Sequence, residues 1–386
     1  MKKVINGFLT LIGFIGLVCL LAFVTGNSHL IKAVTNTYLL GRSGPSIDEH
    51  AIFDNRIVRK STHPFSWKEK KTTVLNGLLP KEEAYHKSFN TAAFLVIKSD
   101  TILFEKYWEN YSDSSLTNSF SVAKSFIGLA VGAAIQDGYI KSVHQPIYEF
   151  LPEYNTEKGR LITIKHLLQM TSGIDFGESY GDPFGFMAKA YYGKNLHEIT
   201  VEKLPIRIAG STWEYQGGNT LLLSFIIEKA TGKKVAEYFS EKIWQPIGAE
   251  NDALWNLDTK NGREKAYCCF YSNARDFAKV GKLYHQNGFF NHLKVLPESY
   301  ILDSKRSVNL EDSEGKLVDY YGYQWWITEF EGETIHYARG ILGQYIVILP
   351  EEDLIFVRLG KLRSEEKINH VPSDLIEYIK MAKRLK

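Results

Sequence analysis

The sequence predicts an α/β protein of the α+β type, in which one antiparallel sheet is flanked by helices. Runs rich in β-branched and aromatic residues stand on both sides of a long helical region, which is expected as an insertion at about residues 138–304. An uncharged run from Val4 to Gly26 predicts an N-terminal transmembrane helix before this fold. The expected divisions are a membrane anchor or signal segment at 1–26, a linker and N-terminal extension at 27–85, and the main domain at 86–386.

The composition is that of a folded globular protein. Of the 386 residues, 44% are hydrophobic and 23% are charged, and the net charge is +2. A nucleic-acid binder needs a strong basic excess, so the sequence excludes that class of partner. Neither a phosphate loop, a dinucleotide fingerprint nor a zinc-type cluster of Cys and His occurs. No cofactor and no metal are therefore expected.

The N-terminal apolar run is long enough to cross a bilayer, for which about 20 residues suffice. Lys2 and Lys3 precede the run, which favours a cytoplasmic N-terminus and a main domain outside the cytoplasm. In the alternative reading, Val24-Thr25-Gly26 is a signal peptidase site and the chain is released. The apolar part of a signal peptide usually has about 7–15 residues, so the longer run here favours an uncleaved anchor.

Strands are expected near both ends of the main domain. Residues 91–97 and 101–107, separated by the turn Lys98-Ser99-Asp100, predict a hairpin. Further strands are expected at 322–328, 334–338, 344–349 and 353–357, followed by a final helix at about 373–386. Between these two groups, helical patterns occupy residues 164–170, 220–230 and 274–286.

Two of the three cysteines, Cys268 and Cys269, are adjacent. Disulfide geometry is hard to meet across one peptide bond, so we interpret this pair as unpaired residues of a small buried strand. The third, Cys19, lies in the N-terminal apolar run.

The pattern that carries chemistry is Ser121-Val122-Ala123-Lys124, at the start of a helix expected to run to Asp137. Residues three apart lie on one helix face, so Lys124 can reach Ser121. A serine hydroxyl is a poor nucleophile until a neighbouring base takes its proton, and a lysine can be that base where apolar surroundings disfavour its charged form. The residues after Lys124 are almost all apolar, and the helix N-terminus favours developing negative charge.

The spacing alone is a weak signal. Ser313–Lys316 and Ser364–Lys367 share it, but both lie among charged residues and are typical of solvated surface. Only Ser121–Lys124 opens an apolar helix, and its alternative interpretation is an N-cap serine beside a lysine that extends to solvent.

Further motifs in order along the chain give a resemblance to a known family. They are Ser121–Lys124, the run HLLQMTSG at 166–173, Tyr215-Gln216-Gly217, and Ala338-Arg339-Gly340 followed by Gly343-Gln344. With these, the region from about Ala92 to Val357 resembles the serine β-lactamase and penicillin-binding-protein superfamily. It is most similar to the class C β-lactamase-like esterase branch, and within that to nylon-oligomer (6-aminohexanoate) hydrolases.

The resemblance implies a β-lactamase/transpeptidase-like fold and a serine hydrolase mechanism. Ser121 would form an acyl-enzyme, and Lys124 and Tyr215 would move the proton. The backbone N–H groups of Ser121 and Ile341 would form the oxyanion hole, and Gly340 would let a substrate approach the strand edge closely.

Two departures from the family pattern shift the expected substrate. Gly217 replaces the asparagine of the second motif, with Asn219 two residues later, and Ala338 replaces the lysine of the third. Adjacent strand residues point to opposite faces, so Arg339 is not expected to substitute for that lysine. Cleavage of a small-molecule carboxylic ester or linear amide is therefore favoured over β-lactamase or D-Ala-D-Ala carboxypeptidase activity. A non-catalytic, anchored β-lactam-sensing or binding module is the third reading.

An aromatic-rich loop around Asp182 is expected to line the cleft and to influence substrate preference. The alternative is a surface loop that only packs against the domain. On this basis Asp182 is a candidate substrate-binding residue.

Overall fold

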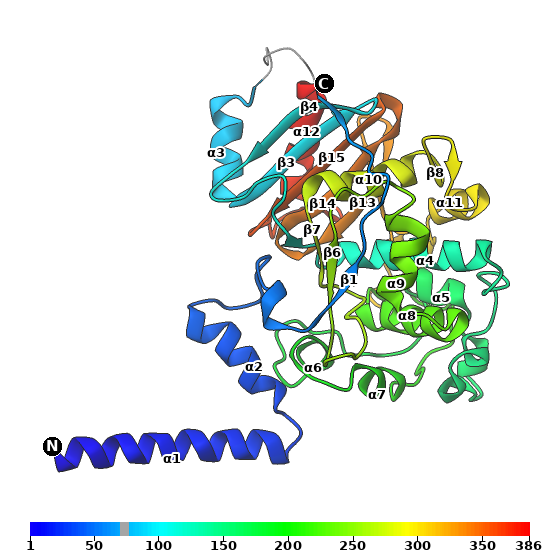
Figure 1. Cartoon of the computed structure of the whole chain (residues 1–386). Helices are drawn as coiled ribbons and strands as arrows, with labels where there is room; N and C mark the ends of the chain where they lie inside the picture. Colours follow the sequence, from blue (N-terminus) through cyan, green and yellow to red (C-terminus); the bar gives the residue numbers. More distant parts are fainter. Residues whose placement is uncertain (70–76) are drawn as a thin grey trace.

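The computed structural model describes residues 1–69 and 77–386 (Figure 1). Its centre is a seven-stranded sheet with the strand order β12-β13-β14-β15-β3-β4-β2. Neighbouring strands run antiparallel except β2, which is parallel to β4. The strands are β2 (Lys68–Glu69), β3 (Thr91–Lys98), β4 (Thr101–Tyr107), β12 (Trp326–Phe330), β13 (Glu333–Gly340), β14 (Gln344–Leu349) and β15 (Leu354–Gly360).

The prediction of one antiparallel sheet built from both ends of the main domain is confirmed. The hairpin β3–β4 precedes the insertion and β12–β15 follow it, and the two groups meet where β15 pairs with β3. The last group starts later than expected: β12 begins at Trp326 because Gly322–Gln324 form a turn, in which Gln324 has φ +64°.

Helices cover both faces of this sheet, as Figure 1 shows. Helix α10 (Ala274–His285) packs on β3, β14 and β15, and α12 (Ser373–Leu385) covers the opposite face. The alternation of β3 fits this arrangement, because Leu95 and Ile97 join one apolar cluster and Phe94 and Val96 join the other. The remaining helices of the main domain are α3 (Pro80–Ser88), α4 (Val122–Gln136), α5 (Ile164–Leu168), α6 (Phe186–Tyr192), α7 (Leu196–Val201), α8 (Gly217–Thr231), α9 (Val235–Phe239) and α11 (Glu298–Ser304).

Helix α4 is buried almost throughout, as its all-round apolar sequence predicts. It packs against α8, against the helical turn at Ser240–Trp244 and against the strands β13 and β14. Gly138 follows the helix with φ +78°, a left-handed conformation that glycine adopts at low cost.

One buried side chain, Gln324, links three helices beneath the sheet. Its amide donates to the carbonyl oxygens of Leu167 and Leu168 in α5, each at 3.1 Å. Its side-chain oxygen accepts from Thr220 Oγ1 in α8 at 2.8 Å, and its backbone oxygen accepts from Ser125 Oγ in α4 at 2.6 Å. These bonds fix the helix that carries Ser121 relative to the helix that follows Tyr215.

Short strands also lie outside the seven-stranded sheet, and four of them, β6 to β9, fall within the insertion at about residues 138–304. A four-stranded sheet has the order β1-β6-β7-β5, and three strand pairs are separate from it. The strands are β1 (Asn55–Val58), β5 (Thr117–Asn118), β6 (Ala253–Asn256), β7 (Phe270–Ser272), β8 (Phe289–Phe290), β9 (Leu293–Lys294), β10 (Leu310–Glu311), β11 (Leu317–Val318), β16 (Lys367–Ile368) and β17 (Val371–Pro372).

The segment at 27–85 does more than connect the N-terminal helix to the main domain. Strand β1 pairs with β6, and Ile47 and Val58 are fully buried in the larger apolar cluster. Helix α2 (His29–Asn36) packs beside α6. These contacts are long-range, so the local sequence could not indicate them.

The N-terminal run forms helix α1 (Lys2–Val24), which is long and apolar enough to cross a membrane. None of its most apolar stretch is buried against the rest of the chain. The expected apolar helix is therefore present.

His86 contributes to the pH dependence of stability. It is fully buried between aromatic rings, and its ring centroid lies 4.7 Å from that of Trp108 and 5.1 Å from that of Tyr378. Burial, with a smaller contribution from Arg358, lowers its pKa to about 3. Below the ordinary histidine pKa the unfolded chain binds a proton that the folded chain does not, so stability falls as the pH drops from about 6.5 towards 3.

We therefore expect His86→Phe to lose less stability between pH 7 and pH 5 than the wild-type chain, by about 2 kcal/mol. Denaturant unfolding of the full chain in detergent at the two pH values measures this difference. Equal losses in both proteins would contradict it, whatever the variant's absolute stability.

Candidate active site

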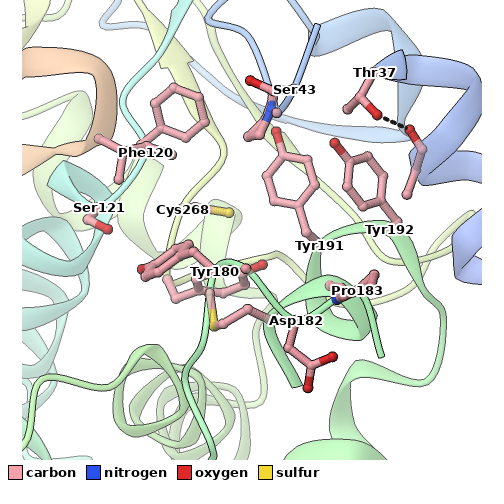
Figure 2. A pocket seen from close by; sticks show the side chains of 18 of the residues that line it. Thr37, Ser43, Phe120, Ser121, Tyr180, Asp182, Pro183, Tyr191, Tyr192 and Cys268 are labelled. Carbon is pink, nitrogen blue, oxygen red and sulfur yellow. Dashed lines mark hydrogen bonds between the residues drawn. The ribbon is translucent and has the colours of Figure 1, made fainter. Parts of the chain in front are cut away.

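A cavity of about 530 Å³ opens beside the N-terminus of α4. Figure 2 shows Phe120, Ser121 and Cys268 in one part of it and Tyr191, Tyr192 and Ser43 in another. Segments far apart in the sequence form its walls: the stretch after α1, the loop before α6, the turn before β7 and the chain after β13. The lining residues are Ala33, Thr37, Tyr38, Ser43, Gly44, Pro45, Phe120, Ser121, Tyr180, Gly181, Asp182, Pro183, Met187, Ala188, Tyr191, Tyr192, Tyr267, Cys268, Ile341 and Arg363.

Ser121 and Lys124 are in direct contact, as the helix spacing predicts. Ser121 is the N-cap residue of α4, and Lys124 Nζ lies 2.9 Å from its Oγ. Lys124 is only 1% exposed, and its second hydrogen bond runs to the carbonyl oxygen of Tyr267 at 3.1 Å. The lysine therefore does not extend to solvent, so the alternative interpretation of the pair is wrong.

Tyr215 lies on the other side of the lysine. Its ring centroid is 5.0 Å from Lys124 Nζ, and the ring packs against Trp326 at 5.1 Å and Tyr321 at 5.9 Å. The three expected catalytic residues are thus brought together, and the aromatic cluster holds the Tyr215 ring in place.

The two backbone groups expected to form an oxyanion hole flank the same cavity. Ser121 and Ile341 both line it, and within the described parts of the chain neither N–H donates to another residue. Both groups are thus free to donate to a substrate oxygen in the cavity.

Gly340 meets a steric requirement of the chain itself, and the expected approach of a substrate to it stays a prediction. A Cβ placed on it would lie 2.4 Å from the carbonyl oxygen of Ser119 and 3.2 Å from Cβ of Phe120. The glycine is therefore required by the close approach of the chain itself, since it lets the end of β13 lie against the segment that leads into Ser121.

The strand β13 separates Ala338 and Arg339 onto opposite faces, as the period of a strand predicts. Ala338 is fully buried in the apolar cluster that includes α4. The Arg339 guanidinium lies 3.5 Å from the centroid of the Trp326 ring and donates to the His370 carbonyl at 3.1 Å. Neither residue takes the place of the family's lysine. Asn219, which follows two residues after the position of the second-motif asparagine, is buried against Met170 and Gln216.

The loop around Asp182 lines the cavity, with Tyr180 beside it (Figure 2). The Asp182 carboxylate accepts from the backbone N–H of Phe184 at 2.9 Å, within its own loop. Asp182 is solvent-exposed, at the rim of the cavity.

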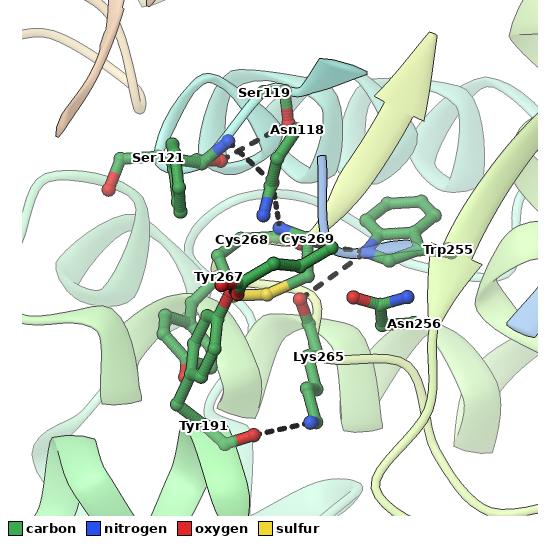
Figure 3. Close-up of a disulfide and its surroundings, with 12 residues drawn as sticks. Asn118, Ser119, Ser121, Tyr191, Trp255, Asn256, Lys265, Tyr267, Cys268 and Cys269 are labelled. Carbon is green, nitrogen blue, oxygen red and sulfur yellow. Dashed lines mark hydrogen bonds between the residues drawn. A yellow bond between two sulfur atoms is a disulfide. The ribbon is translucent and has the colours of Figure 1, made fainter. Parts of the chain in front are cut away.

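The interpretation of Cys268 and Cys269 as unpaired was wrong, because the two form a disulfide (Figure 3). The expectation that they are buried is confirmed, at 4% and 0% exposed. They stand in a tight turn before β7, not in a strand. In this turn Cys269 has φ +67°, a left-handed backbone that brings the neighbouring side chains within bonding distance.

Sequence reasoning missed three groups at the site. Glu178 accepts from the Gly217 N–H at the start of α8 and from Tyr180 Oη. The Tyr267 carbonyl accepts from Lys124, and the Asn118 side chain accepts from the Phe120 N–H at 2.9 Å. The Glu178–Gly217 and Tyr267–Lys124 contacts join segments far apart in the sequence, and the Tyr267 acceptor is a backbone atom, so no local pattern marks them. In the described residues no group of three or more His, Cys, Asp or Glu side chains is placed to hold a metal ion.

A Ser-x-x-Lys helix packed against an antiparallel sheet of this order is the architecture of the serine β-lactamase and penicillin-binding-protein superfamily. The Beta-lactamase family model matches residues 80–375, so the chain belongs to that family.

Similar proteins include hydrolases. The chain is 28% identical over 302 residues to a 6-aminohexanoate-dimer hydrolase of Paenarthrobacter ureafaciens, covering 73% of this chain and 75% of that protein. A solved structure of a proposed 6-aminohexanoate-dimer hydrolase from Bacillus anthracis superposes with a TM-score of 0.74 at 22% identity, over 88% of this chain and 93% of that one. A family VIII carboxylesterase gives a TM-score of 0.62 at 15% identity, over 82% and 100%. The two structural matches show the fold alone, and the resemblance to nylon-oligomer hydrolases stated from the motifs is confirmed.

The close contact at Gly340 predicts that Gly340→Ala lowers the reaction rate at Ser121 by about tenfold or more, because the added methyl displaces the segment before the serine. The rate of labelling by a fluorophosphonate probe measures this. Gly77→Ala is the matched control, because a Cβ there meets nothing within 4 Å. Equal labelling rates for both variants would show that the close approach does not position Ser121.

Proposed function

We propose that this protein is a membrane-anchored serine hydrolase that forms an acyl-enzyme on Ser121 and cleaves a carboxylic ester or a linear amide. The observation that carries the proposal is the 2.9 Å contact between Lys124 Nζ and Ser121 Oγ, made by a lysine that is 1% exposed. A buried lysine beside a serine is costly unless its amine has a function, since an apolar side chain would fill the same space more favourably.

In the proposed reaction Ser121 Oγ attacks the substrate carbonyl and Lys124 accepts the hydroxyl proton. The developing oxyanion is held by the N–H groups of Ser121 and Ile341. Tyr215, whose ring lies 5.0 Å from the Lys124 amine, passes the proton to the leaving group. Lys124 and Tyr215 then activate a water that hydrolyses the acyl-enzyme.

The surroundings of the serine favour esters and linear amides over β-lactams. The family's third-motif lysine, which binds the substrate carboxylate, is the buried Ala338 here, and the Arg339 guanidinium stacks on Trp326 and donates to the His370 carbonyl. Acyl transfer needs only the nucleophile, the base and the oxyanion hole, all of which remain. The names of the similar hydrolases, one acting on an amide dimer and one a carboxylesterase, agree with this substrate class.

The cavity also supports a position at the membrane. Helix α1 ends at Val24, and Ala33, Thr37 and Tyr38 already line the cavity wall. The site therefore lies a few residues along the chain from the proposed anchor. A disulfide is typical of proteins outside the cytoplasm, which agrees with the orientation predicted from Lys2 and Lys3.

We expect a fluorophosphonate probe to label the wild-type chain in the membrane fraction, and a membrane-impermeant form of it to label intact cells. Ser121→Ala should lose labelling entirely, and Lys124→Met should retain less than about one hundredth, because general-base help is worth about 10²–10⁴-fold. If wild type and Ser121→Ala label alike, the hydrolase proposal fails. If the labelled chain is found in the soluble fraction alone, the proposal of a membrane anchor fails.

A panel of a short aryl ester, a linear amide oligomer, a chromogenic cephalosporin and a D-Ala-D-Ala peptide tests the substrate class. We expect turnover of the ester or the linear amide and little of the other two, because no cation occupies the position of Ala338. Cephalosporin turnover that rivals the ester would overturn this part of the proposal. Labelling at Ser121 without turnover of any member would favour the binding-module reading.

A further inference from the structure

The turn at residues 265–269 makes two separate contacts near the nucleophile. One is with the base, Lys124, and the other is with Asn118, in the segment that leads into Ser121. The carbonyl oxygen of Tyr267 accepts from Lys124 Nζ at 3.1 Å. Two residues later, the Cys269 N–H donates to the side-chain oxygen of Asn118 at 3.1 Å. The same oxygen accepts from the N–H of Phe120, the residue before Ser121, at 2.9 Å. One turn therefore holds the base directly and the nucleophile through one side chain.

The disulfide lies between these two contacts. It joins Cys268 to Cys269, so the covalent bond is adjacent to the Tyr267 carbonyl on one side and includes the residue that binds Asn118 on the other (Figure 3). Cys269 has φ +67°, a conformation that non-glycine residues adopt at a cost and keep only where their surroundings impose it. The bond between the two side chains is one such restraint on this backbone.

A general stabilising role does not account for this disulfide. A disulfide stabilises a protein mainly by closing a loop in the unfolded chain, and the effect grows with the number of residues in the loop. Here the sequence separation is 1, so the unfolded chain is barely restricted. What the bond restricts is local, namely the direction of the peptide groups in the turn.

We propose that the Cys268–Cys269 disulfide is a positioning element for Lys124 and Ser121, and that full hydrolytic activity requires it to be oxidised. This inference rests on the proposed serine hydrolase function. The Lys124 amine is held between two groups, the Ser121 hydroxyl and the Tyr267 carbonyl, so a displaced carbonyl turns the amine away from Ser121 Oγ.

The disulfide can be reached through the substrate cavity, because Cys268 lines that cavity and its sulfur is seen there in Figure 2. A small dithiol supplies two electrons and two protons. The S–S bond breaks, two cysteine thiols form, and the dithiol leaves as its own cyclic disulfide. Reoxidation by a small disulfide reverses the exchange.

The test compares the wild-type chain, the double variant Cys268→Ala/Cys269→Ala, and Cys19→Ser as the matched control. Cys19 is the remaining cysteine and lies in α1, away from the cavity. We expect reduction of the wild type to slow fluorophosphonate labelling and kcat for an ester by about tenfold, with little change in KM, and reoxidation to restore both. The double variant should be slow from the start and insensitive to dithiol, and Cys19→Ser should behave as the wild type.

The pH profile separates positioning from general loosening of the fold. Withdrawal of this carbonyl removes one hydrogen-bond acceptor from the Lys124 amine, so it should move the acid limb of the kcat/KM profile. A purely structural role would lower the rate at every pH without moving that limb. Thermal unfolding of the reduced chain shows whether it remains folded during these measurements.

Each outcome bears on one proposal at a time. If the oxidised chain is not labelled at Ser121, the serine hydrolase function fails. If the oxidised chain is labelled, and the reduced chain and the double variant react at the same rate with the same pH profile, the positioning role is overturned. Alkylation of Cys268 and Cys269 in the untreated chain, found by peptide mass, would also overturn it, because the disulfide would then be absent.

Discussion

The buried amine of Lys124 is the constraint on which the rest of the site depends. Its side chain is 1% exposed, and removing a lysine amine from water is unfavourable unless hydrogen-bond acceptors replace the lost water. Here two acceptors do so, Ser121 Oγ from the same helix and the Tyr267 carbonyl from a turn 143 residues further on. The site is complete only when the folded chain brings these acceptors to one point.

Much of the surrounding structure keeps that point fixed. Gln324 joins α4 to α5 and α8. These bonds hold the helix that carries the lysine against the helix that follows Tyr215. Gly340 lets the end of β13 approach Ser119 closely, which holds the entry to α4 from the sheet side. Asn118 holds the same entry from the side of the disulfide turn. Three contacts from different directions thus define where Ser121 Oγ stands.

The sequence predicted those features whose cause is local. The hairpin strand at residues 91–97, the apolar helix α4 and the helix spacing of Ser121 and Lys124 were each confirmed, because neighbouring residues largely determine them. Strand β1 was missed because its partner β6 is about 200 residues away. The Tyr267 carbonyl was missed because a backbone oxygen has no sequence signature. The disulfide was not predicted, because adjacent cysteines are in general difficult to join. The left-handed backbone of Cys269 accompanies the bond here.

The strand β13 shows how the family's chemistry and its substrate recognition are carried by separable residues. In the proposed mechanism the end of the strand, at Gly340 and Ile341, contributes to the oxyanion site through backbone atoms, so side-chain changes nearby would leave it intact. Recognition of a substrate carboxylate depends instead on one side chain that points to the site, and that position is Ala338, sealed in the apolar core. The Arg339 guanidinium stacks on Trp326 and donates to the His370 carbonyl. Because successive residues alternate between faces, Arg339 could take the position of Ala338 only after a shift in strand register. The proposed change of substrate class therefore requires no change in Ser121, Lys124 or Tyr215.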